Sequence, residues 1–293
     1  MAAANLLSLI PTAIPFLSAT KIIIVDHDIF NLQIRINLNL MTIFSRHFSS
    51  IVFMVIVSFM TILSVVCPAI AQQSTGNKKE LVILLHGLGR GKSIMMPMKE
   101  QMEISGFQVS VVDYRSIGRT PEEILRDVGQ QIKDFRVDTT QTVHLVGHSL
   151  GGLIIRAYLD SVRVRALGRV VLIGSPSKGT PFVDHFRDAW WLKLVGPAAS
   201  SLGTDEKSFP RTLHPPYYPV GIIAGISSMI DNEDFIPGED DGIVPVESTK
   251  IERMTDFILL PVSHSSLPKN ETVMRQTIEF LKNGRFLKEE IQK

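Results

Sequence analysis

The sequence predicts an α/β fold with a doubly wound, mostly parallel sheet, and three observations predict it. Short apolar runs alternate with helical segments from about residue 80 to residue 173, as in such sheets. The first run, Leu81–Leu85, is continuously apolar, as expected of a strand buried on both faces. Thr120-Pro121-Glu122-Glu123 combines an N-cap, a first-turn proline and a glutamate three residues after the cap, so a helix begins between two of the runs.

The expected elements follow one another along the chain up to Ser175. Gly106 ends the first helical segment, and the helix capped by Thr120 runs to about Phe135. In a sheet of this kind, ligands bind at the edge where the strands have their carboxyl ends. Strands are expected at 81–85, 107–112, 142–146 and 169–173, and helices at 93–105, 120–135 and 150–161.

The regular alternation of strands and helices ends after Ser175, which indicates an insertion. Residues 180–218 contain several prolines, Trp190 and Trp191 and little strand character, so we expect a cap of short helices and loops. The closing helix has an apolar stripe, which is typical of a helix packed on a sheet. The sheet is completed by strands at 220–224 and 257–260 and by this helix at 270–283, with its stripe at Val273, Met274, Ile278 and Leu281.

Residues 1–71 are expected to be a leader outside the folded domain. Met41 starts a segment with a short basic region, an apolar run at 51–66 and small residues up to Ala71, which is the order of a secretory signal peptide. Because such a peptide begins near the N-terminus, we interpret residues 1–40 as an upstream extension, with a natural leader of unknown purpose as the alternative. The apolar run is shorter than the roughly 20 residues of a spanning helix.

Cleavage after Ala71 would leave one domain at 72–293 and a secreted or periplasmic protein. The alternative is an uncleaved run at 51–66 that anchors the protein in a membrane. Cys67 is the one cysteine of the chain and lies in the leader. The domain itself would therefore have no disulfide, no cysteine nucleophile and no thiolate metal site.

Charge and spacing argue against several classes of partner. The chain has 30 Lys+Arg and 29 Asp+Glu without a run of like charges, so nothing indicates binding to nucleic acid. Gly91-Lys92-Ser93 is similar to the end of a phosphate-binding P-loop, but the glycine that this loop requires five residues earlier is His86. We therefore expect no nucleotide, no other cofactor and no metal. The sequence leaves the oligomeric state open.

The segment from Gly147 to Gly151 matches the pattern G-x-S-x-G, which alone is weak evidence. Its context is stronger, because an apolar strand precedes it and a helix with a further glycine, Gly152, follows it. Such a context puts the serine on a tight strand-to-helix turn, with its hydroxyl above the sheet at a helix N-terminus. We therefore expect Ser149 to be a nucleophile; the alternative is a serine that only caps the helix.

A serine nucleophile needs a histidine base and a carboxylate, and in this arrangement their chain order is serine, acid, histidine. His264 follows the last expected strand, and Asp241 stands directly before a glycine turn, so both are expected at the carboxyl edge of the sheet. Asp240 is the alternative acid. An oxyanion hole is expected from the backbone N–H groups of Leu150, after the nucleophile, and of Leu88, in the loop after the first strand.

Three segments resemble the lipase and esterase branch of the α/β-hydrolase superfamily. Within that branch the chain is similar to bacterial triacylglycerol lipases and to the GPI inositol-deacylase-like group. The resemblance covers about residues 80–283, and it implies the α/β-hydrolase fold, a Ser149–Asp241–His264 triad and an oxyanion hole at the two leucines. The segments are Ile83–Gly89 (ILLHGLG), Gly147–Gly152 (GHSLGG) and Gly174–Pro181 (GSPSKGTP).

These residues together predict a serine hydrolase that cleaves carboxylic esters of a small molecule or a lipid through an acyl-serine. The same triad would serve an acyltransferase or a thioesterase, and the third alternative is a non-catalytic binding protein of the same fold, which should lack a triad member. The segment at 182–213, with Trp190 and Trp191, is either a lid over an apolar acyl pocket, in transient contact with a lipid interface, or a cap whose tryptophans only pack.

Overall fold

A computed structural model of the chain describes residues 79–227 and 233–288. The predicted leader, with its signal peptide at 41–71 and the apolar run at 51–66, lies outside the described residues. The described residues belong to the compact unit that extends from Lys78 to Lys293. No helix among residues 79–227 and 233–288 is long and apolar enough to cross a lipid bilayer.

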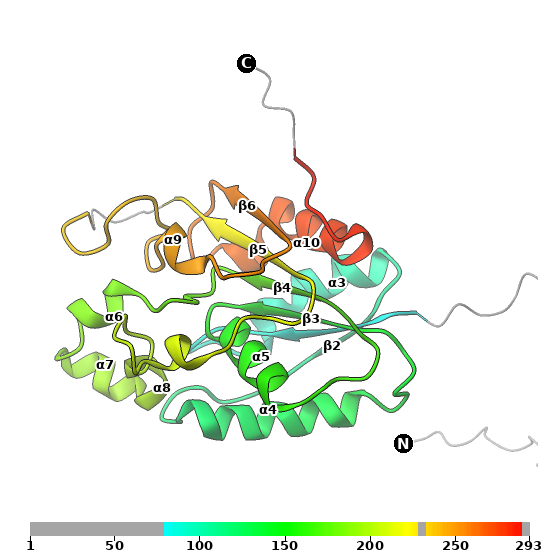
Figure 1. The fold of residues 1–293 in the computed structure, drawn as a ribbon, viewed down its shortest axis with the longest axis horizontal. Coiled ribbons are helices and arrows are strands. Elements are labelled where there is room, and N and C mark those ends of the chain that lie inside the picture. The colour runs from blue at the N-terminus through cyan, green and yellow to red at the C-terminus, as the bar shows by residue number, and fades with distance from the viewer. Residues whose placement is uncertain (1–78, 228–232, 289–293) are drawn as a thin grey trace, which may run out of the picture. The chain divides into compact units, whose positions relative to one another are not determined.

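A six-stranded sheet forms the centre of this unit, with the strand order β2-β1-β3-β4-β5-β6 (Figure 1). Every neighbouring pair of strands is parallel. The predicted α/β class and the doubly wound parallel sheet are therefore confirmed. The strands are β1 (Leu81–Leu85), β2 (Gln108–Val111), β3 (Val143–His148), β4 (Leu167–Ile173), β5 (Val220–Gly225) and β6 (Asp256–Leu260).

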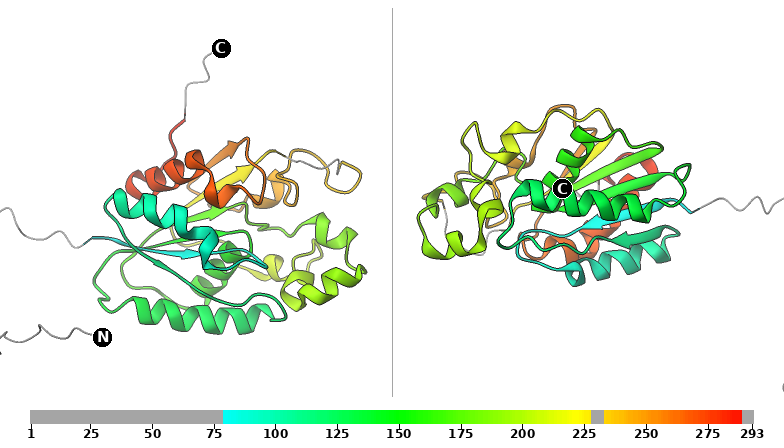
Figure 2. Two further views of the ribbon diagram at one scale, coloured as in Figure 1. Left: turned by 180° about the vertical axis from the view of Figure 1, so that it is seen from behind. Right: turned by 90° about the horizontal axis from the view of Figure 1, so that it is seen from below.

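Helices cover both faces of the sheet, as Figures 1 and 2 show. Helices α3 (Met96–Ile104) and α10 (Glu271–Asn283) lie on one face, and α4 (Pro121–Phe135) and α5 (Leu150–Ser161) on the other. Shorter helical segments lie in the connections between these strands and helices. These are η1 (Lys92–Met95), α6 (Pro181–His185), α7 (Trp190–Val195), α8 (Pro197–Ser200), η2 (Phe209–Thr212), α9 (Val246–Thr249) and η3 (Leu267–Lys269).

The residues of β1 explain this layering. Ile83 packs into one buried cluster with Ile124 of α4 and Leu153 of α5. Val82 and Leu84 point the opposite way, into a second cluster that includes Met98 of α3 and Phe280 of α10. Because successive side chains of a strand alternate between faces, a continuously apolar strand holds helices on both sides of the sheet.

Several element boundaries differ from the expected ones for local reasons. The expected helix at 93–105 begins as the 3-10 turn η1, and Gly106, at φ 100°, ends it. The expected strand at 142–146 extends to His148, directly before Ser149. Thr120 forms the predicted capping box, since its side chain accepts from the N–H of Glu123 and the Glu123 side chain accepts from the N–H of Thr120.

The predicted insertion lies between β4 and β5 and contains α6, α7, α8 and η2. Phe182, Phe186 and Trp191 pack against one another, and Phe235, from the segment after β5, packs against both phenylalanines. Trp190 differs from its neighbour because it is 73% exposed. One tryptophan of the pair therefore packs within the cap, whereas the other faces solvent.

Candidate active site

Ser149 stands on a sharp turn between β3 and α5. Its backbone has φ 55° and ψ −124°, a conformation that costs a non-glycine residue about 1–3 kcal/mol. The N–H of Ser149 donates to the carbonyl of Ile173 at the end of β4, over 2.9 Å. The strained turn is held in place by the neighbouring strand, and the serine lies at the carboxyl edge of the sheet as predicted.

The glycines beside Ser149 let the backbone of this turn approach its neighbours. A Cβ atom on Gly147 would lie 2.5 Å from the backbone N of Gly152. A Cβ atom on Gly151 would lie 2.5 Å from the carbonyl oxygen of His86, at the start of the loop after β1. Both distances are shorter than real Cβ contacts, so the turn and its packing against β1 require glycine at these positions.

The structure brings His264 and Asp241 to the same place as Ser149. His264 Nε2 lies 3.0 Å from Ser149 Oγ. On the other side of the ring, His264 Nδ1 lies 2.8 Å from Asp241 Oδ2. All three residues are buried. A histidine placed between a hydroxyl and a carboxylate can withdraw the hydroxyl proton, while the carboxylate fixes its tautomer and stabilises its positive charge.

The backbone around Asp241 decides which of the two adjacent aspartates faces His264. Asp241 Oδ1 accepts the N–H groups of Ile243 and Val244, at 3.1 and 2.8 Å, which leaves Oδ2 directed at the imidazole. The backbone N–H of His264 donates to the carbonyl of Asp241 at 2.8 Å. The side chain of Asp240 instead accepts the N–H of Gly242. The geometry therefore pairs Asp241, and not Asp240, with His264.

Leu88 and Leu150 lie at the positions expected for oxyanion donors. Leu150 is the first residue of α5, and Leu88 follows His86 and Gly87 in the loop after β1. Within the described part of the chain, neither backbone N–H has a hydrogen-bond partner. Two N–H groups without partners beside a nucleophile can stabilise a negative oxygen.

Tyr114 holds the loop that contains Leu88, a contact that the sequence did not indicate. Its hydroxyl donates to the carbonyl of His86, and the two rings stack with centroids 4.1 Å apart and planes 8° apart. Burial raises the pKa of Tyr114, so the hydroxyl remains a donor. Further along the same loop, the N–H of Gly89 donates to Ser116 Oγ at 2.9 Å.

Comparisons with known proteins agree with this fold. The sequence profile of a family described as "Alpha/beta hydrolase family" matches residues 82–246. The putative carbamate hydrolase RutD of Variovorax paradoxus (strain S110) is 35% identical over 109 residues, which are 34% of this chain and 39% of that protein. The chain therefore spans well under half the length of this curated relative.

Solved structures show the same fold at low identity. Bacillus licheniformis lipase BlEst2 in its mature form superposes with a TM-score of 0.60 at 19% identity, over 71% of this chain and 94% of the lipase. The phospholipase PlaB from Legionella pneumophila, solved in complex with thio-NAD, has a TM-score of 0.53 at 14% identity, over 70% of this chain and 62% of PlaB. At these identities the likeness establishes the fold alone.

Proposed function

Because the chain belongs to the α/β-hydrolase family, we propose that it is a serine hydrolase that cleaves carboxylic esters through an acyl-serine intermediate. The family match confirms the resemblance of the three sequence segments. The observation that supports the proposal most is the hydrogen-bonded series Ser149–His264–Asp241, with distances of 3.0 and 2.8 Å. A non-catalytic binding protein of this fold has no need for a buried serine, histidine and aspartate aligned in this way.

The proposed reaction has two steps. His264 Nε2 accepts the proton of Ser149 as the hydroxyl oxygen attacks the ester carbonyl, and the N–H groups of Leu88 and Leu150 bind the oxyanion. The alcohol leaves with the proton that His264 returns. Water then attacks the acyl-serine, with His264 as base, and releases the acid. Asp241 fixes the tautomer of His264 and stabilises the imidazolium in both steps.

The mechanism is tested by Ser149→Ala. This variant should hydrolyse p-nitrophenyl esters at least about 10³-fold more slowly than the wild type while its circular dichroism is unchanged. A fluorophosphonate probe should add to Ser149 in the wild type and leave the variant unlabelled. Ser161→Ala, at the other end of α5, is the matched control. Ester hydrolysis or probe labelling at the wild-type level in Ser149→Ala would refute the proposal.

The exposed side of α7 supports an apolar or lipid ester as substrate. Trp190 and Leu194 are 73% and 69% exposed and stand four residues apart, hence on one face of a short helix. Such an apolar pair on a cap suits contact with a lipid interface. Rates should therefore rise on emulsified esters in the wild type and less so in Trp190→Ser/Leu194→Ser. Equal rates on dissolved and emulsified esters would favour a cap that only packs.

The leaving group and the acyl acceptor distinguish the remaining reactions. A thioesterase or an acyltransferase would form the same acyl-serine, and the carbamate hydrolase among the relatives makes aryl carbamates a further probe. Burst kinetics with p-nitrophenyl esters, thioesters and carbamates, with and without an added alcohol, compare the leaving groups and acceptors directly. We expect water as acceptor and the oxygen ester as the fastest substrate.

The proposed site of action is outside the cytoplasm. The predicted signal peptide at 41–71 supports secretion, and membrane anchoring through an uncleaved run at 51–66 is the alternative. N-terminal sequencing of the protein made in a secreting host tests both. Gln72 as the first residue supports secretion, whereas a retained segment that includes 51–66 supports anchoring.

A further inference from the structure

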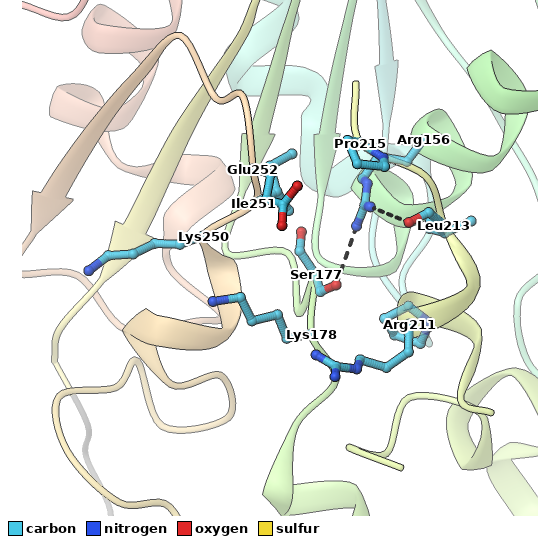
Figure 3. A pocket seen from close by; sticks show the side chains of 10 residues that line it. Arg156, Ser177, Lys178, Arg211, Leu213, Pro215, Lys250, Ile251 and Glu252 are labelled. Atoms are coloured by element: carbon cyan, nitrogen blue, oxygen red, sulfur yellow. Dashed lines mark hydrogen bonds between the residues drawn. The ribbon is translucent and has the colours of Figure 1, made fainter. Parts of the chain in front are cut away.

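An open pocket with an excess of positive charge lies beside α5. Four of the residues that line it are cationic and one is acidic. Arg156 stands seven residues after Ser149, a distance of about 10 Å along the helix, so no step of ester hydrolysis proposed above uses it. The cationic residues are Arg156, Lys178, Arg211 and Lys250, and the acidic one is Glu252 (Figure 3).

Arg156 is a buried cation whose hydrogen-bond partners are neutral. It is 3% exposed, and its terminal nitrogens donate to the carbonyls of Ser177, Leu213 and His214 at 3.1–3.3 Å. Its Nε has no partner in the described part of the chain. The charge of Asp160, one turn further along α5, acts on Arg156, but the Asp160 carboxylate accepts the N–H of His214 and is not among the hydrogen-bond partners of Arg156. A buried charge with neutral partners favours an anion nearby.

The other cations of the pocket differ in whether their charge is already paired. Lys250 forms an ion pair with Glu247 of α9, and its side chain extends away from the pocket in Figure 3. Lys178 and Arg211 form no ion pair within residues 79–227 and 233–288. Arg156, Lys178 and Arg211 are therefore three cations around one pocket, with Glu252 as the acidic side chain among the lining residues.

Ser177 adds a neutral donor to the same pocket. Its side chain is buried, and its hydroxyl has no hydrogen-bond partner among the described residues. Three cations with a hydroxyl match an anion of more than one charge with several acceptor oxygens better than a single carboxylate. We propose that this pocket binds a phosphate group, either as a free phosphate or phosphomonoester or as the headgroup of a lipid.

The test measures phosphate binding by calorimetry at constant ionic strength, so that general screening does not contribute. The wild-type chain should bind inorganic phosphate in a saturable manner, and Lys178→Gln/Arg211→Gln should bind it roughly tenfold or more weakly. Arg126→Gln/Lys133→Gln makes the same change of charge on α4, outside the pocket, and should bind as the wild type does. Glu252→Gln should bind more tightly, because it removes the like charge.

The same four proteins distinguish the two sources of the phosphate group. Glycerol 3-phosphate is titrated in solution, and vesicles of phosphatidylcholine with or without phosphatidic acid are tested by flotation. If binding of glycerol 3-phosphate requires Lys178 and Arg211, the pocket takes a soluble phosphate. If only the binding of phosphatidic acid vesicles requires them, the pocket takes a lipid headgroup. Wild-type binding that equals that of Lys178→Gln/Arg211→Gln for every ligand, or no saturable binding at all, overturns the proposal.

Discussion

The imidazole of His148 lies against the imidazole of His264, with ring centroids 4.9 Å apart. His148 Nε2 donates to the carbonyl oxygen of His264 at 3.1 Å, which means that this nitrogen has the proton. Burial, and then the charge of His264, lower the pKa of His148 well below its ordinary value. His148 is therefore neutral beside the proposed base and holds the backbone from which that base extends.

The first prediction concerns this contact. His148→Leu removes the donor and leaves the carbonyl of His264 without a partner, so kcat should fall roughly tenfold while KM changes little. His148→Gln places an amide donor at a similar distance along the side chain and should recover most of the rate. Steady-state kinetics on a p-nitrophenyl ester checks both. Wild-type kcat in His148→Leu would show that the contact has no positioning role.

The second prediction separates the two adjacent aspartates. Asp241→Asn should lower kcat by about 10³–10⁴-fold, because an amide facing His264 Nδ1 favours the wrong tautomer. Asp240→Asn should keep kcat within a few-fold, since its side chain accepts from the backbone of its own turn. The two variants have the same change of charge at neighbouring positions. A large loss of kcat in Asp240→Asn and not in Asp241→Asn would reverse the assignment.

The third prediction concerns Tyr114. Tyr114→Phe keeps the stacked ring but removes the hydroxyl that donates to the carbonyl of His86. The loop with Leu88 should become less well ordered, so kcat should fall several-fold to tenfold with little change in KM. A boronic acid inhibitor, which mimics the tetrahedral oxyanion, should bind more weakly by a similar factor. Unchanged inhibitor binding would count against a role for Tyr114 in the oxyanion hole.

Local sequence was sufficient to predict the elements that position Ser149. The continuously apolar run Leu81–Leu85 marked β1, shorter apolar stretches marked β3 and β4, and Thr120 with Glu123 marked the start of α4. The serine turn was predictable because its glycines, the strand before it and the helix after it are contiguous. The position of His264 near Ser149 was predictable because a loop that follows a parallel strand begins at the same edge of the sheet.

Contacts between distant segments could not be predicted in this way. Tyr114 meets His86 because β2 pairs with β1 in parallel, and nothing in either segment specifies that register. The glycine turn favoured Asp241 over Asp240, but the contact of Asp241 Oδ2 with His264, from a segment 23 residues further along the chain, is seen only in the folded structure. Arg156 occupies an ordinary helical position, and the pocket beside it exists only once the segments around Ser177 and Leu213 pack against α5.

The fourth prediction compares two glycines. Gly151→Ala would place a methyl group 2.5 Å from the carbonyl oxygen of His86 and 2.7 Å from that of Leu85, and neither backbone atom can move without displacing β1. The free energy of unfolding should fall by about 1–3 kcal/mol. Gly129→Ala in α4 meets Tyr158 at 3.5 Å and should be neutral or stabilise by up to ~1 kcal/mol. Urea unfolding measures both, and equal effects would contradict the close packing at Gly151.

The fifth prediction concerns acid stability. Burial is the largest cause that lowers the pKa of His86, His144 and His148 in the folded protein. In the unfolded chain these rings take up protons as the pH falls below about 6.5, whereas the folded protein does so only at lower pH. The unfolded state therefore binds more protons in this window, and the free energy of unfolding falls by up to ~1.4 kcal/mol per pH unit for each ring.

Urea unfolding between about pH 7.5 and pH 5 measures this slope. His148→Gln removes one of the three rings, and its free energy of unfolding should depend less steeply on pH than that of the wild type. His185→Gln is the matched control, because His185 is exposed in the folded protein. The free energy of unfolding has its full value above the ordinary pKa of histidine, where folded and unfolded rings are both neutral. It decreases further with each step to lower pH. A slope in His148→Gln equal to that of the wild type would mean that His148 takes up its proton over the same pH range in the folded and unfolded states, in conflict with the burial that lowers its pKa.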